Sequence, residues 1–140
     1  MPGVGNICIR LGSMQDYRAL RVWQVAYLTC LEVYRYTRSF PASERYGLVT
    51  QIRRASVSVC ANIAEGCGRM SRRDLIRFLY IAHGSASEVE CELAISAGLG
   101  FLPRRDHAKL QASIVQIKRM LGTLIRRVRD ADNRGKGSDR

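Results

Sequence analysis

The chain has 140 residues, which is enough for one domain with its own core and short for two ordinary domains. Apolar residues make up 46% of it and charged residues 25%, a composition typical of a folded protein rather than a disordered one. No apolar run approaches the roughly 18 residues that cross a bilayer, and the N-terminus lacks the pattern of a secretory signal. We therefore expect a soluble, cytoplasmic protein with no membrane partner.

The cysteines are five in number, widely spread and never arranged as a CxxC pair. An odd, scattered set argues against both a disulfide framework and a zinc site, so we expect reduced thiols. They are Cys8, Cys30, Cys60, Cys67 and Cys91.

The net charge is +11, and all but three of the 23 basic residues are arginines. Guanidinium groups bind phosphate through paired hydrogen bonds, so this excess favours an anionic partner such as nucleic acid. The alternative is that a GC-rich genome supplies the arginines and that the charge only keeps the protein soluble. Composition leaves both readings open.

Residues 1–16 carry no helical period, and we expect a flexible lead-in there. Met14 stands directly before the first patterned segment and is an alternative start of translation to Met1. The first helix is predicted over residues 17–39, because apolar side chains recur there at spacings of three and four. The inward positions are predicted to be Leu20, Trp23, Tyr27, Cys30, Tyr34 and Thr37, with Ala26 and Val33 widening the stripe, so that the three aromatics serve packing.

The second helix is predicted over residues 46–65, after Pro41 breaks the first and with Ser43 as its cap. Its apolar stripe is Leu48, Ile52, Ala55, Val59 and Ile63. The Gly66-Cys67-Gly68 triplet predicts a helix end in the left-handed conformation, and Ser71 with Asp74 resembles the capping box of a third helix.

The third helix is predicted from Asp74 to near Leu99, and it is acidic in its later half. A corner at residues 98–103 precedes the fourth helix, which has the most regular apolar seam and the densest positive charge of the chain. The seam consists of Leu110, Ile114, Ile117, Leu121, Leu124 and Val128.

Four amphipathic helices joined by short loops predict an all-α protein, an antiparallel up-down four-helix bundle over residues 17–130. Residues 131–140 have only Ala131 to anchor them, and we expect a disordered basic tail.

Several separated blocks resemble the four-helix-bundle proteins encoded by intervening sequences within bacterial 23S ribosomal RNA genes. The blocks are DYRALRVWQVAY, YGLVTQIRRASVSVCANIAEGCGR, FLYIAHGSASEVECEL and LGFL, and the resemblance spans residues 15–128. It implies a ring-like assembly, commonly a homopentamer, and RNA binding. One departure is Cys60, which stands where that family often has proline. A more distant resemblance is to the accessory variability determinant of diversity-generating retroelements, a basic pentameric barrel that binds nucleic acid and a reverse transcriptase.

Two basic clusters are candidates for binding phosphate, one at the corner between the second and third helices and one along the fourth helix. The opposing interpretation is an ordinary solvated surface, which we favour for Arg104 and Arg105. No exposed aromatics are predicted among these charges, so neither base stacking nor sequence-specific binding is indicated. The candidate nucleic-acid-binding residues are Arg69, Arg72, Arg73, Arg77, Lys109, Lys118, Arg119, Arg126, Arg127 and Arg129.

A second candidate is the polar block Asn62, Glu65, Gly66 and Gly68, which we interpret as a structural motif made by interhelical hydrogen bonds, capping or a subunit contact. The carboxylates Glu88, Glu90 and Glu92 are candidates for meeting a basic face of a neighbouring subunit.

Catalysis, a metal site and a cofactor are not expected. His83 and His107 are isolated, and no phosphate-cradling loop is present in the sequence. Cys67, within the arginine-rich corner, is the candidate for a more reactive thiol, although no partner base is identifiable.

The leading hypothesis is a non-enzymatic oligomer that binds RNA, or DNA, through its phosphate backbone. The alternative is an oligomeric adaptor for a protein partner, such as a reverse transcriptase, with the charge incidental.

Overall fold

The computed structural model describes residues 16–138, and these residues form four α-helices without any strand. This confirms the all-α class predicted from the sequence. Two short 3-10 turns, Tyr17–Ala19 and Ala42–Glu44, precede the first and second helices. The helices are α1 (Arg21–Thr37), α2 (Leu48–Cys67), α3 (Arg72–Gly98) and α4 (Arg104–Gly137).

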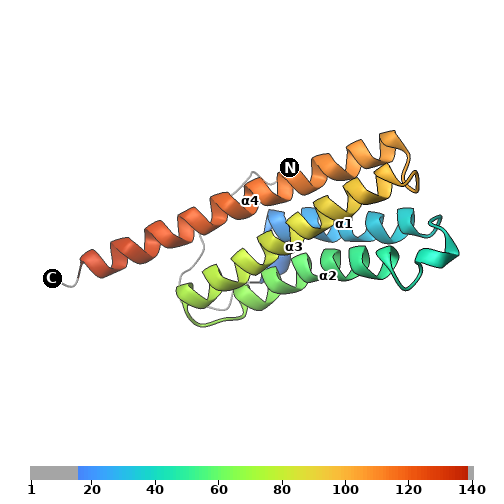
Figure 1. Ribbon diagram of the computed structural model, residues 1–140. Coiled ribbons are helices and arrows are strands. Elements are labelled where there is room, and N and C mark those ends of the chain that lie inside the picture. The colour runs from blue at the N-terminus through green and yellow to red at the C-terminus, as the bar shows by residue number, and fades with distance from the viewer. Residues whose placement is uncertain (1–15, 139–140) are drawn as a thin grey trace.

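Each helix packs against two others, in the cyclic order α1, α2, α3, α4 and back to α1. Figure 1 shows the α1–α2 and α3–α4 connections at one end of the molecule and the α2–α3 connection at the other. The buried apolar side chains of all four helices form a single core. The four-helix arrangement expected from the amphipathic segments is therefore present.

The orientation of α1 differs from the sequence prediction. The side of α1 that faces the core carries Val22, Ala26 and Val33, whereas Tyr27 and Tyr34 are 44% and 39% exposed. The predicted stripe was wrong for these two tyrosines and right for Ala26, Cys30 and Val33, which are buried: the centre of the buried face lies about one residue before each tyrosine. Tyrosine has an apolar ring and a polar hydroxyl, so a boundary position satisfies both parts.

The two ends of α2 also differ from prediction. Ser43 lies within the 3-10 turn and does not cap α2; instead Glu44 Oε2 accepts a hydrogen bond from the Leu48 N–H at 3.1 Å. At the other end, Gly66 and Cys67 still belong to the helix, and Gly68 ends it in the right-handed region with φ of −81°. The left-handed ending predicted there was wrong.

Gly66 is buried because α3 passes close to it. A Cβ at this position would lie 3.0 Å from Phe78 Cβ and 3.1 Å from Leu75 Cδ1. The glycine therefore favours the close approach of α2 and α3, because Phe78 or Leu75 would have to shift to admit a Cβ. The start of α3 follows the prediction, since Ser71 Oγ accepts from the Asp74 N–H at 3.1 Å.

The α3–α4 corner turns at Gly100, which has φ of 78° and is the single residue with positive φ among residues 16–138. Beyond it, α4 runs for 34 residues to Gly137. Residues 131–137 are thus helical, and the disordered tail expected there was wrong for them. Ile125 is buried and Leu124 only half-buried, so the seam shifts by one residue near its end: Leu110, Ile114, Ile117, Leu121, Ile125 and Val128.

A polar layer joins α2 to α3. The Ser58 and Ser85 hydroxyls lie 2.9 Å apart, and the Asn62 side-chain amide donates to the Ser58 hydroxyl at 3.0 Å and to the Ser58 carbonyl at 2.8 Å. Asn62 therefore positions an interhelical hydrogen bond, which agrees with the structural interpretation of that residue. Glu92 Oε2 is buried near this layer and has no partner within the described residues. Burial, and then the charge of Glu88, raise the pKa of Glu92 to about 7.

Replacing Gly66 with valine should lower the free energy of unfolding by about 1–3 kcal/mol, because the added carbons overpack the α2–α3 contact. Chemical denaturation measures this loss. Gly84→Val is the matched control, since a Cβ at Gly84 meets nothing within 4 Å. Equal midpoints for the two variants would contradict the close-approach role of Gly66.

The raised pKa of Glu92 means that the folded protein binds the carboxyl proton more tightly than the unfolded chain does. The stability gained from this proton is complete below pH 4.5 and is lost as the pH rises through about 7. Glu92→Gln, which stays neutral, should be more stable than the wild type at pH 8 by about 1 kcal/mol, a figure reduced for the partial exposure of the side chain. Thermal unfolding at pH 8 and pH 4.5 measures this difference. The gain should vanish at the lower pH, and an equal gain at both would contradict the assignment.

Candidate nucleic-acid interface

A group of four cations lies on the side of α4 away from its apolar seam. Lys118, Arg119, Arg126 and Arg127 are here called the basic ridge. Arg119 and Arg126 lie opposite the seam because seven residues complete about two helical turns, while Lys118 flanks them on the α3 side and Arg127 on the α1 side. The arginines of the ridge are exposed and Lys118 is half-buried. Burial of the seam fixes the rotation of α4, and therefore directs these side chains outward.

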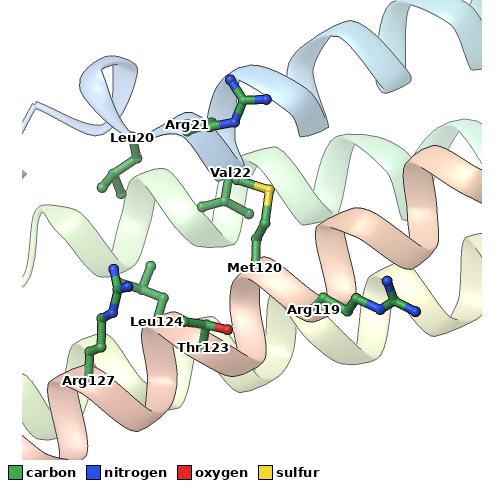
Figure 2. A pocket seen from close by; sticks show the side chains of 8 residues that line it. All are labelled: Leu20, Arg21, Val22, Arg119, Met120, Thr123, Leu124 and Arg127. Carbon is green, nitrogen blue, oxygen red and sulfur yellow. The ribbon is translucent and has the colours of Figure 1, made fainter. Parts of the chain in front are cut away.

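A hollow of about 330 Å³, here the α1 hollow, lies between the start of α1 and the basic ridge. Figure 2 shows Leu20 and Val22 on one side of it, facing Met120 and Leu124 on the other. Arg127 stands at one edge of the view and Arg119 points away at the opposite edge. The hollow thus combines an apolar floor with a cationic rim; its remaining lining residues are Arg21 and Thr123.

A second and more polar hollow of about 660 Å³, here the α3 hollow, lies on the other side of the ridge. Arg119 and Thr123 border both hollows, so the ridge separates them. The side chains lining the α3 hollow are His83, Glu90, Val115, Lys118, Arg119, Thr123 and Arg126, with Gly122 at its base.

The charge of the ridge is largely uncompensated. Lys118 has a carboxylate partner, Glu90 Oε2 at 3.6 Å. Arg126 donates to the Thr123 hydroxyl at 3.3 Å, a neutral partner. Within residues 16–138, neither Arg119 nor Arg127 forms an ion pair. Exposed arginines without carboxylate partners keep their full charge available to an anion.

The predicted cluster of arginines at the start of α3 has more partners within the protein than the ridge has. Arg69 pairs with Glu65 at 2.5 Å, and its guanidinium lies 4.9 Å from the Phe78 ring centre. Arg77 lies 4.8 Å from the same ring. Arg72 donates to the Ala131 carbonyl at 2.8 Å and thereby joins α3 to the C-terminal part of α4.

The extension of α4 adds a cation to this cluster. Lys136 lies with Arg72 and Arg73 around a hollow of about 450 Å³ that Asp132 also borders. Arg129 lies on α4 between the ridge and this hollow. Its guanidinium donates to the Tyr80 hydroxyl of α3. Basic residues therefore continue along the α3–α4 side from the ridge to the start of α3.

Lys109 does not belong to this group. Its ammonium pairs with Glu32 Oε1 at 3.1 Å and so connects α4 to α1. This hydrogen bond raises the pKa of Lys109. This pair partly neutralises Lys109, whose role as a phosphate ligand stays a prediction.

Sequence reasoning missed three residues of these hollows: Arg21, His83 and Lys136. Arg21 and His83 stand in other helices than the ridge, and no periodicity connects residues so far apart in sequence. Lys136 was assigned to a disordered tail, although the helical spacing from Asp132, with which it pairs at 2.8 Å, was a usable signal.

The expectation that no exposed aromatics accompany the arginines was wrong. Tyr80 is 51% exposed, and its hydroxyl accepts a hydrogen bond from Arg129. An aromatic ring therefore does adjoin a candidate arginine on this surface. Elsewhere, between α1 and α2, the Arg53 guanidinium lies 4.6 Å from the centre of the Tyr34 ring.

The acidic residues of α3 have separate surroundings. Glu90 pairs with Lys118 of its own chain, while Glu88 and Glu92 border a hollow of about 500 Å³ between α2 and α3. Arg54 and Gln51 line the α2 side of that hollow. Glu88 is exposed and stays a candidate for a contact with another subunit.

Cys67 does not have the reactive thiol suggested by its basic neighbourhood. Its side chain is buried, and burial, with the charge of Asp16, raises the pKa of the thiol to about 11. A thiol with this pKa is protonated at neutral pH and is a poor nucleophile. Cys30, Cys60, Cys67 and Cys91 are all unbridged, and Cys8 lies outside the described residues.

Among residues 16–138, no group of three or more His, Cys, Asp or Glu side chains is placed to hold a metal ion. In the same part of the chain, no helix is both long and apolar enough to cross a lipid bilayer.

Comparison with known proteins identifies the chain at the level of a family. The model of the 23S rRNA-intervening sequence proteins matches residues 18–123. A crystal structure from Bacteroides thetaiotaomicron VPI-5482, described as a protein with unknown function from the S23 ribosomal protein family, has the same fold. Its TM-score is 0.68 at 23% sequence identity, over 74% of this chain and 97% of that one. No curated protein sequence matches at a significant level. With the family model covering most of the helical region described above, the chain belongs to the 23S rRNA-intervening sequence protein family.

Proposed function

We propose that this protein is a non-enzymatic, cytoplasmic, nucleic-acid-binding oligomer that binds RNA, or DNA, through the phosphate backbone with little sequence preference. Its protomer is an antiparallel up-down four-helix bundle, and the connections at alternating ends of the molecule support that order. The assembly is a ring, with five copies as the expected number. No cofactor takes part.

The basic ridge is the observation that carries this proposal. Arg119 and Arg127 are exposed and unpaired in the described residues, and Arg126 adds a third guanidinium two turns from Arg119. Arginine matches the geometry of phosphate oxygens with paired donors, so such a face favours a polyanion over a neutral partner. Repetition of the ridge around a ring would raise affinity through multivalency.

An exposed apolar stripe on α1 supports self-association. Leu28 and Leu31 are 62% and 50% exposed, and Tyr27 and Tyr34 extend the stripe at helical spacing. Large apolar side chains grouped on one exposed face are typical of protein interfaces. The stripe lies on a different helix from the basic ridge, so both surfaces can act together.

The same stripe also favours the alternative function, an oligomeric adaptor for a protein partner such as a reverse transcriptase. In that case the basic ridge is incidental or faces an acidic protein surface. The two functions differ in their dependence on nucleic acid, which the first experiment below addresses.

Changing Arg119, Arg126 and Arg127 together to glutamate should weaken RNA binding by about a hundredfold or more, because three attractive phosphate contacts become repulsive. Fluorescence anisotropy with labelled RNA across a salt series measures the affinity, which for the wild type should fall steeply as salt rises. The matched control is the triple change of Arg38, Arg104 and Arg105 to glutamate, which alters the net charge equally on exposed residues away from the ridge. Absence of wild-type binding at low salt, or equal losses for both triple variants, would contradict the proposal.

Changing Leu28 and Leu31 to glutamate should convert the oligomer to monomers, because burial of the stripe in an interface would then bury two unpaired carboxylates. Analytical ultracentrifugation measures the mass, and circular dichroism should show unchanged helix content since both side chains are exposed. Leu99→Glu, at the exposed α3–α4 corner, is the control for an added surface charge. A wild-type protein that sediments as a monomer would contradict the proposed ring.

A further inference from the structure

The α1 hollow differs from the other hollows of this surface, because its floor is apolar while its rim is cationic. The floor consists of Leu20, Val22, Met120 and Leu124, contributed by two helices far apart in sequence. Its volume of about 330 Å³ falls within the range of small-ligand sites. A purely phosphate-binding surface has no need of such a floor, so the hollow indicates a ligand with an apolar part as well as negative charge.

The arrangement of charge restricts that ligand further. Arg119 and Arg127 border the floor at two edges, and Arg21 borders it from α1. Eight residues separate the two α4 arginines, which places their Cα atoms about 12 Å apart along the helix. Negative charge is therefore favoured on both sides of the apolar part. A nucleotide within a strand has this pattern, since its base lies between two phosphates.

The floor also offers a polar group at one point. Thr123 borders the hollow, and its hydroxyl accepts a hydrogen bond from Arg126 at 3.3 Å on the side of the ridge. An oxygen so placed can also donate its own proton to a carbonyl or ring nitrogen at a base edge. One hydroxyl among aliphatic side chains tolerates any base, which agrees with binding of low sequence preference. Met120 has a flexible thioether that can adapt to the shape of different bases.

We infer that the α1 hollow accepts one unstacked base of a single-stranded nucleic acid, while Arg119 and Arg127 bind phosphates on either side of it. This inference rests on the proposed function and specifies its substrate class. A base in a duplex is stacked and paired, so its ring cannot enter the hollow without the cost of unstacking. The protein therefore prefers single strands to duplexes, beyond the attraction of its charge for either.

Filling the hollow without altering charge tests this inference. Leu124 is half-buried, lines the hollow and contributes only aliphatic carbon, so Leu124→Trp places an indole where the base would lie. Leu48→Trp is the matched control, because Leu48 is also a half-buried leucine but does not line the hollow. Thermal unfolding establishes that both variants fold.

Three labelled probes are compared by fluorescence anisotropy: short oligouridine, the same strand with abasic riboses, and the duplex of oligouridine with oligoadenylate. The wild type should bind oligouridine about tenfold more tightly than the abasic strand, the low end of the advantage known for a base on an aromatic side chain, because this floor is aliphatic. Leu124→Trp should bind both single strands equally and weakly, with unchanged affinity for the duplex. Leu48→Trp should behave as the wild type.

The outcomes separate this inference from the proposed function. Salt-sensitive binding in which oligouridine, abasic strand and duplex are equivalent, and Leu124→Trp has no effect, would overturn the base-binding hollow and leave backbone binding in place. Absence of binding to every probe would overturn both. Free uridine monophosphate supplies a last comparison: it should compete only weakly, and competition as strong as that of the oligonucleotide would assign the hollow to a free nucleotide instead of a strand.

Discussion

Burial of the α4 seam is the constraint on which the rest of this structure depends. Leu110, Ile117 and Leu121 are almost completely removed from solvent, and they fix the rotation of a helix that is longer than the other three. Once that rotation is fixed, the arginines between the apolar positions have only one side available, the outer one. The exposure of these cations is thus a consequence of core packing, and no further interaction is needed to hold them at the surface.

The sequence was sufficient to predict the number of helices, most of their bounds and the position of the basic helix, because all of these follow from periodicity. It was insufficient where two different rotations of a helix would each bury residues with the same spacing. Tyr27 and Tyr34 fit a helical stripe as well as Val22 and Val33 do, and only the packing partners of α1 decide between them. The extension of α4 past Asp130 was missed because a polar helix shows no apolar repeat.

The candidate site was predictable only in part, for the same physical reason. Arg119, Arg126 and Arg127 lie on one helix, so spacing alone could group them. Arg21 and the apolar floor of the α1 hollow come from a distant segment, and no sequence pattern relates the two. A count of charges in the sequence also could not separate Lys109 from the unpaired arginines of the same helix. The Lys109 ammonium is paired with Glu32, a residue of another helix.

The position of Arg119 between two hollows has a consequence for how ligands occupy the surface. The five N–H donors of its guanidinium point along different edges of one plane, so a ligand that draws this plane toward the α1 side would leave fewer donors for the α3 side. Ligands in the two hollows would then compete for a shared side chain. Along a strand of nucleic acid, such antagonism would let a protomer hold one hollow while the other releases, so that attachment at any one point stays brief even when the whole complex persists.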